Sequence, residues 1–294
     1  MKNIISLARP AQWVKNVFIF FPLFFDEKLF SADELLNTLC AFAAFSLAAS
    51  SIYCFNDILD VKSDKLHPKK CKRPIASGKV SLPQAYTTMF VLITAAVAGL
   101  YLLPSTVRYN TIAAVMGYYI LNILYCVKLK HIAIIDTFVI ATGFVIRVFV
   151  GGIVAGIWIS QWIILMTFLL SLFLAFAKRR DDVIIFNTSG MKMRKNIGRY
   201  NIEFLNNSIS IISAMTMISY IMWTMSQDVI ERFGSEHLYI TAVFVLLGML
   251  RYLQLAIVDT KSGSPTNIVL KDRVIHLCVL GWVISFVFII YLLP

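Results

Sequence analysis

The sequence predicts an all-α fold: a polytopic membrane protein with about nine transmembrane helices. Apolar residues make up 59% of the 294 residues and charged residues only 15%, whereas about a quarter of the residues in a soluble domain are charged. Mean hydropathy is +0.77. Apolar stretches close to the roughly 20 residues that a spanning helix needs recur along the whole chain. Lipid offers no partner to the edge of an open sheet. We therefore expect helical spans and one domain, residues 1–294.

Charged or turn-forming sequence separates the apolar stretches and locates the predicted spans in order. The second stretch ends at NDILD, the third follows SLP, the sixth ends at KRRDD and the eighth ends at DTKSG. The first and fourth stretches are the shortest, near or below the minimum spanning length. The nine predicted spans are Val14–Phe25, Leu35–Phe55, Pro83–Leu103, Thr111–Val127, Ile132–Ile157, Gln161–Ala177, Ser208–Ser226, Leu238–Val258 and Ile275–Leu292.

The net charge of +11 is concentrated in alternate loops. Lys and Arg accumulate on the cytoplasmic side of membrane proteins, so the N-terminus is predicted to be cytoplasmic and Pro294 to lie on the far side of the cell membrane. This topology, together with contact to anionic lipid headgroups, accounts for much of the basic charge, and we expect no nucleic-acid partner. The basic segments on the cytoplasmic side are the N-terminal segment and residues 56–82, 128–131, 178–206 and 259–273.

Acidic side chains cluster where the second stretch ends. Asn56, Asp57, Asp60 and Asp64 lie at i, i+1, i+4 and i+8. If the helix continues past the membrane surface, Asn56, Asp60 and Asp64 share one face, with Asp57 beside them. Clustered carboxylates repel one another unless a cation neutralises them, and Mg²⁺ binds through one or two carboxylates together with substrate phosphates. We therefore expect the three aspartates to hold Mg²⁺; the alternative is a solvated loop of mixed charge.

The stretch HPKKCKRPIASGKVS follows directly, and its Lys72 and Arg73 are expected to bind phosphate. NDxxDxxxD followed by RPIASGKVS resembles the first signature of the UbiA superfamily of intramembrane prenyltransferases. The resemblance implies a helical bundle around a central cavity that opens to lipid, with a metal–diphosphate site at its cytoplasmic end. The late segment SPTNIVLKDR is similar to another pattern of that superfamily. Further residues that the resemblance indicates for substrate binding are Tyr125, Lys130, Asp136 and Arg147. For Arg147, which lies within a span, a structural ion pair is an equal alternative.

The end of the sixth stretch departs from the superfamily pattern. UbiA-type proteins usually carry a second motif, DxxxD, at this place, whereas this chain has KRRDD. Asp181 and Asp182 are adjacent and point about 100° apart on a helix, so they cannot form a clamp on one face. Lys178 and Arg179 before them favour direct binding of phosphate. A ligand with a phosphate beyond its metal-bound diphosphate fits such a site.

The N-terminal segment ARPAQWVKNVFIFFPLFF resembles the signature of the decaprenyl-phosphate phosphoribosyltransferase branch of the superfamily, as does the pattern of Lys178, Arg179 and Asp182. We expect polar groups at the cytoplasmic end of the first span to contact phosphate or ribose hydroxyls, although such residues also serve as interface anchors. These groups are Gln12, Lys15 and Asn16, and Tyr200 is added as a phosphate donor.

Three functional hypotheses follow. The first is Mg²⁺-dependent transfer of a 5-phosphoribosyl group from phosphoribosyl diphosphate to a polyprenyl phosphate, with release of diphosphate. The second is a prenyltransferase that moves a polyprenyl chain from its diphosphate to an aromatic acceptor, which the missing DxxxD motif disfavours. The third is a lipid transporter or scaffold, for which the aspartates would be dispensable. The chain length of the isoprenoid, the downstream pathway and any homo-oligomer are left open.

Overall fold

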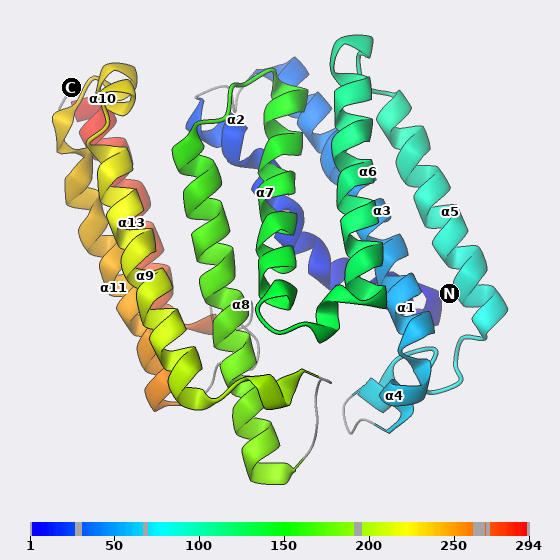
Figure 1. The fold of residues 1–294 in the computed structure, drawn as a ribbon. Helices are drawn as coiled ribbons and strands as arrows, with labels where there is room; N and C mark the ends of the chain where they lie inside the picture. Colours follow the sequence, from blue (N-terminus) through cyan, green and yellow to red (C-terminus); the bar gives the residue numbers. More distant parts are fainter. Residues whose placement is uncertain are drawn as a thin grey trace. The chain divides into compact units, whose positions relative to one another are not determined.

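The computed structural model describes residues 2–26, 31–66, 70–190, 196–260, 268 and 271–292, and among these it contains helices and no strands (Figure 1). Eight helical segments in this part of the chain are long and apolar enough to cross a membrane. They confirm the predicted all-α fold and correspond to the second through ninth predicted spans. These segments are α3 (Ala32–Leu59), α5 (Leu82–Tyr101), α6 (Ser105–Val127), α7 (Ile135–Ala155), α8 (Gln161–Ser189), α9 (Ile202–Thr224), the continuous run of η6 (Glu236–Thr241), α11 (Ala242–Leu253) and η7 (Gln254–Val258), and α13 (Arg273–Leu292).

The chain divides into two compact units, Met1–Ser160 and Gln161–Pro294, and each is described by itself. In the first unit α3 is the central helix and contacts α5, α6 and α7. Its middle is rich in small residues, and Gly99 of α5 lies so close that a Cβ on it would be 3.4 Å from the Cβ of Ala44. Small side chains let helix backbones approach closely, which is how helices pack inside lipid.

The first predicted span adopts an unusual conformation. Residues Pro10–Phe20 form a 3₁₀ helix, η1, which passes directly into the short α-helix α2 (Phe21–Phe25). A 3₁₀ helix rises about 2.0 Å per residue against 1.5 Å in an α-helix. Over these two elements the rise sums to roughly 30 Å, about the thickness of the hydrocarbon core. This length includes Pro10–Trp13, which the predicted span Val14–Phe25 left out.

The three-residue period of η1 places its buried side chains in one straight row. Trp13, Asn16, Ile19 and Pro22 follow at intervals of three, and the last three of them are buried. The row faces α3 and α7, with which η1 is in contact. The Trp13 indole donates to the Ser50 hydroxyl of α3 at 2.9 Å. Side chains at i and i+3 eclipse in a 3₁₀ helix, so one row can follow a neighbouring helix without spiralling away.

Gly151 of α7 lets η1 pack against it backbone to backbone. A Cβ on Gly151 would lie 1.9 Å from the carbonyl oxygen of Ile19, which is far inside van der Waals contact. The neighbouring Gly152 is also restricted, because a Cβ there would lie 2.5 Å from the Ile159 side chain. Both glycines are buried. This part of α7 is therefore closed to any larger residue.

In the second unit, α8 packs against α9, and α11 packs against α13. Arg180 of α8 joins these elements: it donates to the Asn206 side chain of α9 at 2.7 Å and to the carbonyl oxygens of Ala256 and Ile257 at 2.6 and 3.3 Å. These carbonyls belong to η7, a π-helix. A π-helix is a local departure from the hydrogen-bond pattern of an α-helix, and the guanidinium of Arg180 donates to two of its carbonyls.

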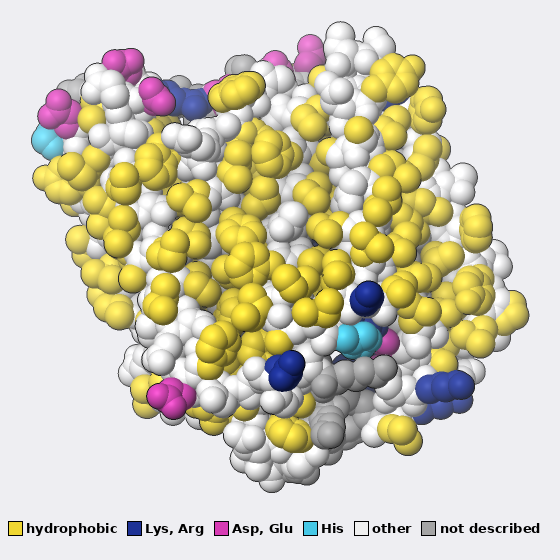
Figure 2. All heavy atoms as spheres, in the orientation of Figure 1, with side chains coloured by type: hydrophobic (Ala, Val, Ile, Leu, Met, Phe, Trp, Pro, Cys, Tyr) yellow, Lys and Arg dark blue, Asp and Glu magenta, His cyan; other side chains and the backbone are white. Residues whose placement is uncertain are grey.

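Hydrophobic side chains cover the visible face along the helices, whereas charged side chains gather toward the helix ends (Figure 2). Leu124 of α6, Ile218 of α9 and Leu277 of α13 are among the exposed ones, at 51%, 57% and 66%. Large exposed apolar surfaces are unfavourable in water and favourable in lipid. The helix surfaces thus agree with the membrane environment predicted from composition.

Candidate active site

The acidic motif lies where α3 ends and the short helix α4 (Val61–Lys65) begins. Asp60 is the residue between them, with φ −89° and ψ 2°, so the direction of the chain changes slightly there. Asp57 and Asp64 are buried, each 2% exposed. The helix does continue past the last apolar residue, which was the condition for the predicted clustering, and it brings all three aspartates to one end of the first unit.

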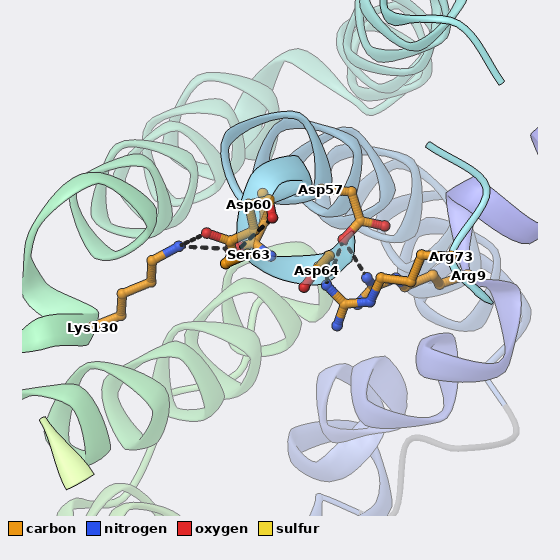
Figure 3. A network of polar contacts seen from close by, with 8 residues as sticks. Arg9, Asp57, Asp60, Ser63, Asp64, Arg73 and Lys130 are labelled. Atoms are coloured by element: carbon orange, nitrogen blue, oxygen red, sulfur yellow. Dashed lines mark hydrogen bonds and ion pairs between the residues drawn. The ribbon is translucent and has the colours of Figure 1, made fainter. Parts of the chain in front are cut away.

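Two arginines bind the buried carboxylates (Figure 3). Arg73 Nη1 lies 3.0 Å from Asp57 Oδ1 and 2.6 Å from Asp64 Oδ2, so it bridges the two aspartates. Arg9 Nη2 contacts the same Asp57 Oδ1 at 2.5 Å. Arg73 was among the residues predicted to bind substrate.

Asp60 is bound separately, by a lysine from another part of the sequence. Lys130, in the single-turn helix η4 (Leu129–His131), donates to Asp60 Oδ1 at 2.7 Å and to the side-chain oxygen of Asn56 at 3.3 Å. The sequence predicted that Asn56, Asp60 and Asp64 share a face. The structure instead pairs Asn56 with Asp60 through Lys130 and Asp57 with Asp64 through Arg73. Helical spacing accounts for both pairs, because residues at i and i+4, or at i and i+7, lie within about 40° of each other around a helix.

Arg9 was not named among the predicted site residues, although it is a central contact of the site. It lies between α1 (Lys2–Ala8) and η1, with the left-handed backbone conformation φ 51°, ψ 57°. Its guanidinium also lies over the ring of Tyr53, 5.3 Å from the centroid. A residue before proline is disfavoured in the right-handed helical region, so the Arg9–Pro10 pair is the one sequence signal that could have indicated a break and a special role here.

The donor set suits Mg²⁺, but the aspartates do not form a ready-made cage. Within the described residues, no group of three or more His, Cys, Asp or Glu side chains is placed to hold a metal ion. Asp57 Oδ2 is buried and accepts no hydrogen bond, so one carboxylate oxygen is available to a cation. Mg²⁺ needs only one or two carboxylates if substrate phosphates supply other ligands. Asp57, Asp60 and Asp64 therefore fit the predicted cofactor in combination with a diphosphate.

Arg147 and Asn16 lie away from this cluster, inside the first unit. Arg147 is 4% exposed and donates to Asn16 Oδ1 at 2.8 Å, to the Gly143 carbonyl at 2.7 Å and to the Tyr118 hydroxyl at 3.1 Å. The amide of Asn16 in turn donates to Ser46 of α3 at 2.8 Å. Both were predicted to bind substrate, which stays a prediction; their contacts with each other and with Gly143, Tyr118 and Ser46 also suit a structural role.

The other predicted residues of the first unit are spread around its polar end. Gln12 and Lys15 are half-buried in η1, Lys72 is exposed in η3 (Lys70–Lys72), and Tyr125 is half-buried in the last turn of α6. Asp136 is completely buried in the first turn of α7. Their roles in substrate binding stay predictions.

In the second unit, Arg179 and Asp182 form an ion pair at 3.1 Å within α8. Arg179 is completely buried and Asp182 is 8% exposed, whereas Lys178 is exposed. Tyr200, after η5 (Ile197–Arg199), is buried and lies edge-on to Phe176. Asp182 thus has an arginine partner in its own helix, in keeping with the predicted loss of a two-aspartate clamp.

Some of the sequence-based interpretations fall outside the described residues. These are the lysines and arginine at 192, 194 and 195 in the basic segment 178–206, and most of the segment SPTNIVLKDR. The predicted sidedness of the termini also stays a prediction.

Comparison with known proteins places this geometry in context. The model of the UbiA prenyltransferase family matches residues 19–269. The chain is 33% identical to the decaprenyl-phosphate phosphoribosyltransferase of Corynebacterium glutamicum over 99% of this chain and 88% of the relative. It is 32% identical to the protein of the same name from Mycolicibacterium smegmatis, over 96% and 91%.

Solved structures agree with the fold. A UbiA homolog from Archaeoglobus fulgidus bound to DMAPP and Mg²⁺ superposes with a TM-score of 0.72 at 16% identity, over 99% of both chains. The same homolog bound to GPP and Mg²⁺ gives 0.70 at 17% identity, over 98% of this chain and 96% of that chain. At this identity the likeness concerns the fold alone.

Proposed function

The chain belongs to the UbiA prenyltransferase family and is a UbiA-type transferase of the membrane, and from this premise we propose that it transfers a 5-phosphoribosyl group. The donor is phosphoribosyl diphosphate, the acceptor is a polyprenyl phosphate, the cofactor is Mg²⁺ and diphosphate is released. The observation that carries the proposal is the cluster of three aspartates held by Arg9, Arg73 and Lys130 at one end of α3. Such a mixture of carboxylates and cations suits a metal-bound diphosphate.

The relatives support the choice of donor and acceptor. Proteins named decaprenyl-phosphate phosphoribosyltransferase match nearly the whole chain at 30–33% identity. The replacement of DxxxD by KRRDD also supports it, because the sequence has no pair of aspartates at i and i+4 there. In addition, Asp182 is paired with Arg179. Lys178 and Arg179 are proposed to bind a phosphate directly.

In this reaction the bond between ribose C1 and the diphosphate oxygen breaks, and an oxygen of the lipid phosphate forms the new bond to C1. Mg²⁺, when bound, neutralises charge that develops on the leaving diphosphate. Asp57, Asp60 and Asp64 would hold the Mg²⁺, and Arg73 and Lys130 would donate to the phosphate oxygens. The acceptor phosphate is already anionic, so it needs little help from a general base. The apolar helices hold the isoprenoid.

The test measures transfer of label from radiolabelled phosphoribosyl diphosphate into organic-extractable lipid, with membranes that contain the protein, a polyprenyl phosphate and either Mg²⁺ or EDTA. Transfer should require Mg²⁺ and should fall roughly 100-fold or more in Asp60→Ala, the scale of losing one transition-state contact. Asp33→Ala is the matched control, because Asp33 is an exposed residue in the first turn of the same helix.

Two results would contradict the proposal. One is label transfer that survives EDTA and Asp60→Ala. The other is no transfer of ribosyl label by the folded protein, together with consumption of a polyprenyl diphosphate in the presence of an aromatic acceptor. The second result would establish the alternative prenyltransferase.

A further inference from the structure

The charges of the aspartate site cancel without a metal. Asp57, Asp60 and Asp64 contribute three negative charges, and Arg9, Arg73 and Lys130 contribute three positive ones in direct contact with them. A divalent cation that arrives alone would enter a neutral site whose carboxylates are already engaged. A diphosphate that arrives alone would compete with these carboxylates for the same arginines and lysine, and their negative charge opposes it. Each ligand is therefore opposed unless the other is present.

The arginines lie between the carboxylates and the surroundings. The side chains of Arg9 and Arg73 are 25% and 23% exposed, whereas those of Asp57 and Asp64 are 1% and 3% exposed. Both guanidinium groups contact the same oxygen, Asp57 Oδ1, and leave the other oxygen without a hydrogen bond. An incoming anion can thus reach the arginines directly, while the carboxylate oxygens that the arginines contact become available only when the arginines release them.

We propose that Arg9 and Arg73 exchange partners when substrate binds: they neutralise Asp57 and Asp64 in the metal-free protein, and they donate to the diphosphate once Mg²⁺ takes their place on the carboxylates. This inference deepens the proposed function and rests on it for the diphosphate ligand. It adds Arg9 to the substrate-binding residues. It also requires that Mg²⁺ and diphosphate bind with positive coupling, each raising the affinity for the other by the same factor.

The backbone of Arg9 supports this role independently of the charges. A non-glycine residue with φ of 51° costs free energy, and such conformations persist where the surroundings enforce them, often at functional sites. Here the left-handed turn between α1 and η1 directs the guanidinium to Asp57 and over the Tyr53 ring. A cation held partly by a ring face can leave a carboxylate without becoming wholly unpaired.

The experiment is calorimetric titration of the purified full-length chain in detergent, with Mg²⁺ alone and with inorganic pyrophosphate in the presence of Mg²⁺. In the unsubstituted protein, pyrophosphate should raise the affinity for Mg²⁺ by roughly tenfold or more, after correction for the complex formed in solution.

In Arg73→Gln the affinity for Mg²⁺ alone and the affinity for pyrophosphate with Mg²⁺ should change in opposite directions. Mg²⁺ alone should bind several-fold more tightly, because it then relieves an uncompensated repulsion between Asp57 and Asp64. Pyrophosphate with Mg²⁺ should bind roughly 10- to 100-fold more weakly, because charge-assisted hydrogen bonds are lost.

Arg9→Gln should change both affinities in the same directions as Arg73→Gln, and it carries the test if Arg73→Gln does not fold. Arg108→Gln is the matched control and should change neither affinity, because Arg108 donates to the Leu103 carbonyl and lies over the Tyr101 ring. Circular dichroism and size-exclusion elution establish that each variant is folded. Weaker binding of both ligands in the arginine variants, or no change in either, would overturn the exchange.

The readout separates this inference from the proposed function, since pyrophosphate carries neither ribose nor lipid. Coupled binding without transfer of label to lipid would leave the exchange standing and reject the ribosyl transfer. Transfer of label without coupling would reject the exchange alone.

Discussion

The buried contact between Arg147 and Asn16 gives the most informative test of the fold. Arg147→Met removes the charge and the donors while filling much of the same volume, and it leaves Asn16 Oδ1 and the Tyr118 hydroxyl without their donor. Asn16→Leu removes the other partner of the contact and also leaves the Ser46 hydroxyl without the hydrogen bond that it accepts from Asn16. The double variant removes both partners together.

The magnitude follows from these contacts. A buried polar group left unsatisfied costs about 1–3 kcal/mol, although side-chain hydrogen bonds in membrane proteins average nearer 0.6 kcal/mol in double-mutant cycles, at most about 1.7. Arg147 also lies over the rings of Phe45, Tyr118 and Phe144, 4.8–5.2 Å from their centroids, and each desolvated cation–π contact adds about 0.5–2 kcal/mol. Against these losses, removal of a buried charge ends its desolvation cost. We expect each single variant to lose about 2–3 kcal/mol, and the double variant to lose about 1–2 kcal/mol less than the sum.

The assay is reversible unfolding in mixed micelles, with the Michaelis constant for phosphoribosyl diphosphate measured on the same preparations. Strictly additive losses would refute the direct coupling of Arg147 to Asn16. Unchanged stability with a large rise in the Michaelis constant would refute the structural role and restore the prediction that both residues bind substrate.

Three further predictions follow from other contacts. Gly151→Ala should cost at least about 2 kcal/mol of unfolding free energy, because its Cβ would overlap the Ile19 carbonyl and the backbones would have to separate; wild-type stability would contradict the close approach. Arg180→Gln should speed proteolysis of the second unit by loosening the π-helix carbonyls, whereas an unchanged cleavage rate would mean that they are satisfied without it. Hydrogen bonding from Arg251 lowers the pKa of Asp272, so the pair's contribution to stability should be fully present above the ordinary pKa of aspartate and be lost as pH falls through the lowered value. In Arg251→Gln the carboxyl resonance of Asp272, followed by NMR, should titrate at higher pH; no shift would contradict the pairing.

Most of the helical fold could be predicted because hydropathy reports what lipid requires. It does not report where a helix ends outside the membrane. The sixth predicted span stops at Ala177, whereas α8 continues to Ser189 through KRRDD. The buried charges of this stretch have protein partners, because Arg179 pairs with Asp182 and Arg180 donates to Asn206 and to the Ala256 carbonyl. Hydropathy also carries no information on helical pitch. The only feature of the sequence that is consistent with the 3₁₀ form of η1 is the three-residue spacing of Trp13, Asn16 and Ile19.

The local part of the site could likewise be predicted, and its long-range part only incompletely. Asp57, Asp60 and Asp64 lie on one continuous stretch, so their spacing alone brings them together. Lys130 was predicted as a site residue from the resemblance to the UbiA superfamily, not from its spacing in the sequence. The contact between Arg9 and Asp57 joins residues 48 positions apart and depends on the turn before η1, so no local pattern encodes it.

The straight row along η1 makes the segment a spacer of fixed length. One inserted residue would rotate every later side chain by about 120°, and would turn Asn16 and Ile19 off the face that meets α3 and α7. Three inserted residues would restore the face but would lengthen the segment by about 6 Å, and would carry Arg9 out of reach of Asp57. Sequences that keep both ends of this contact are therefore expected to keep the number of residues between Arg9 and Pro22 unchanged, even where the residues themselves differ.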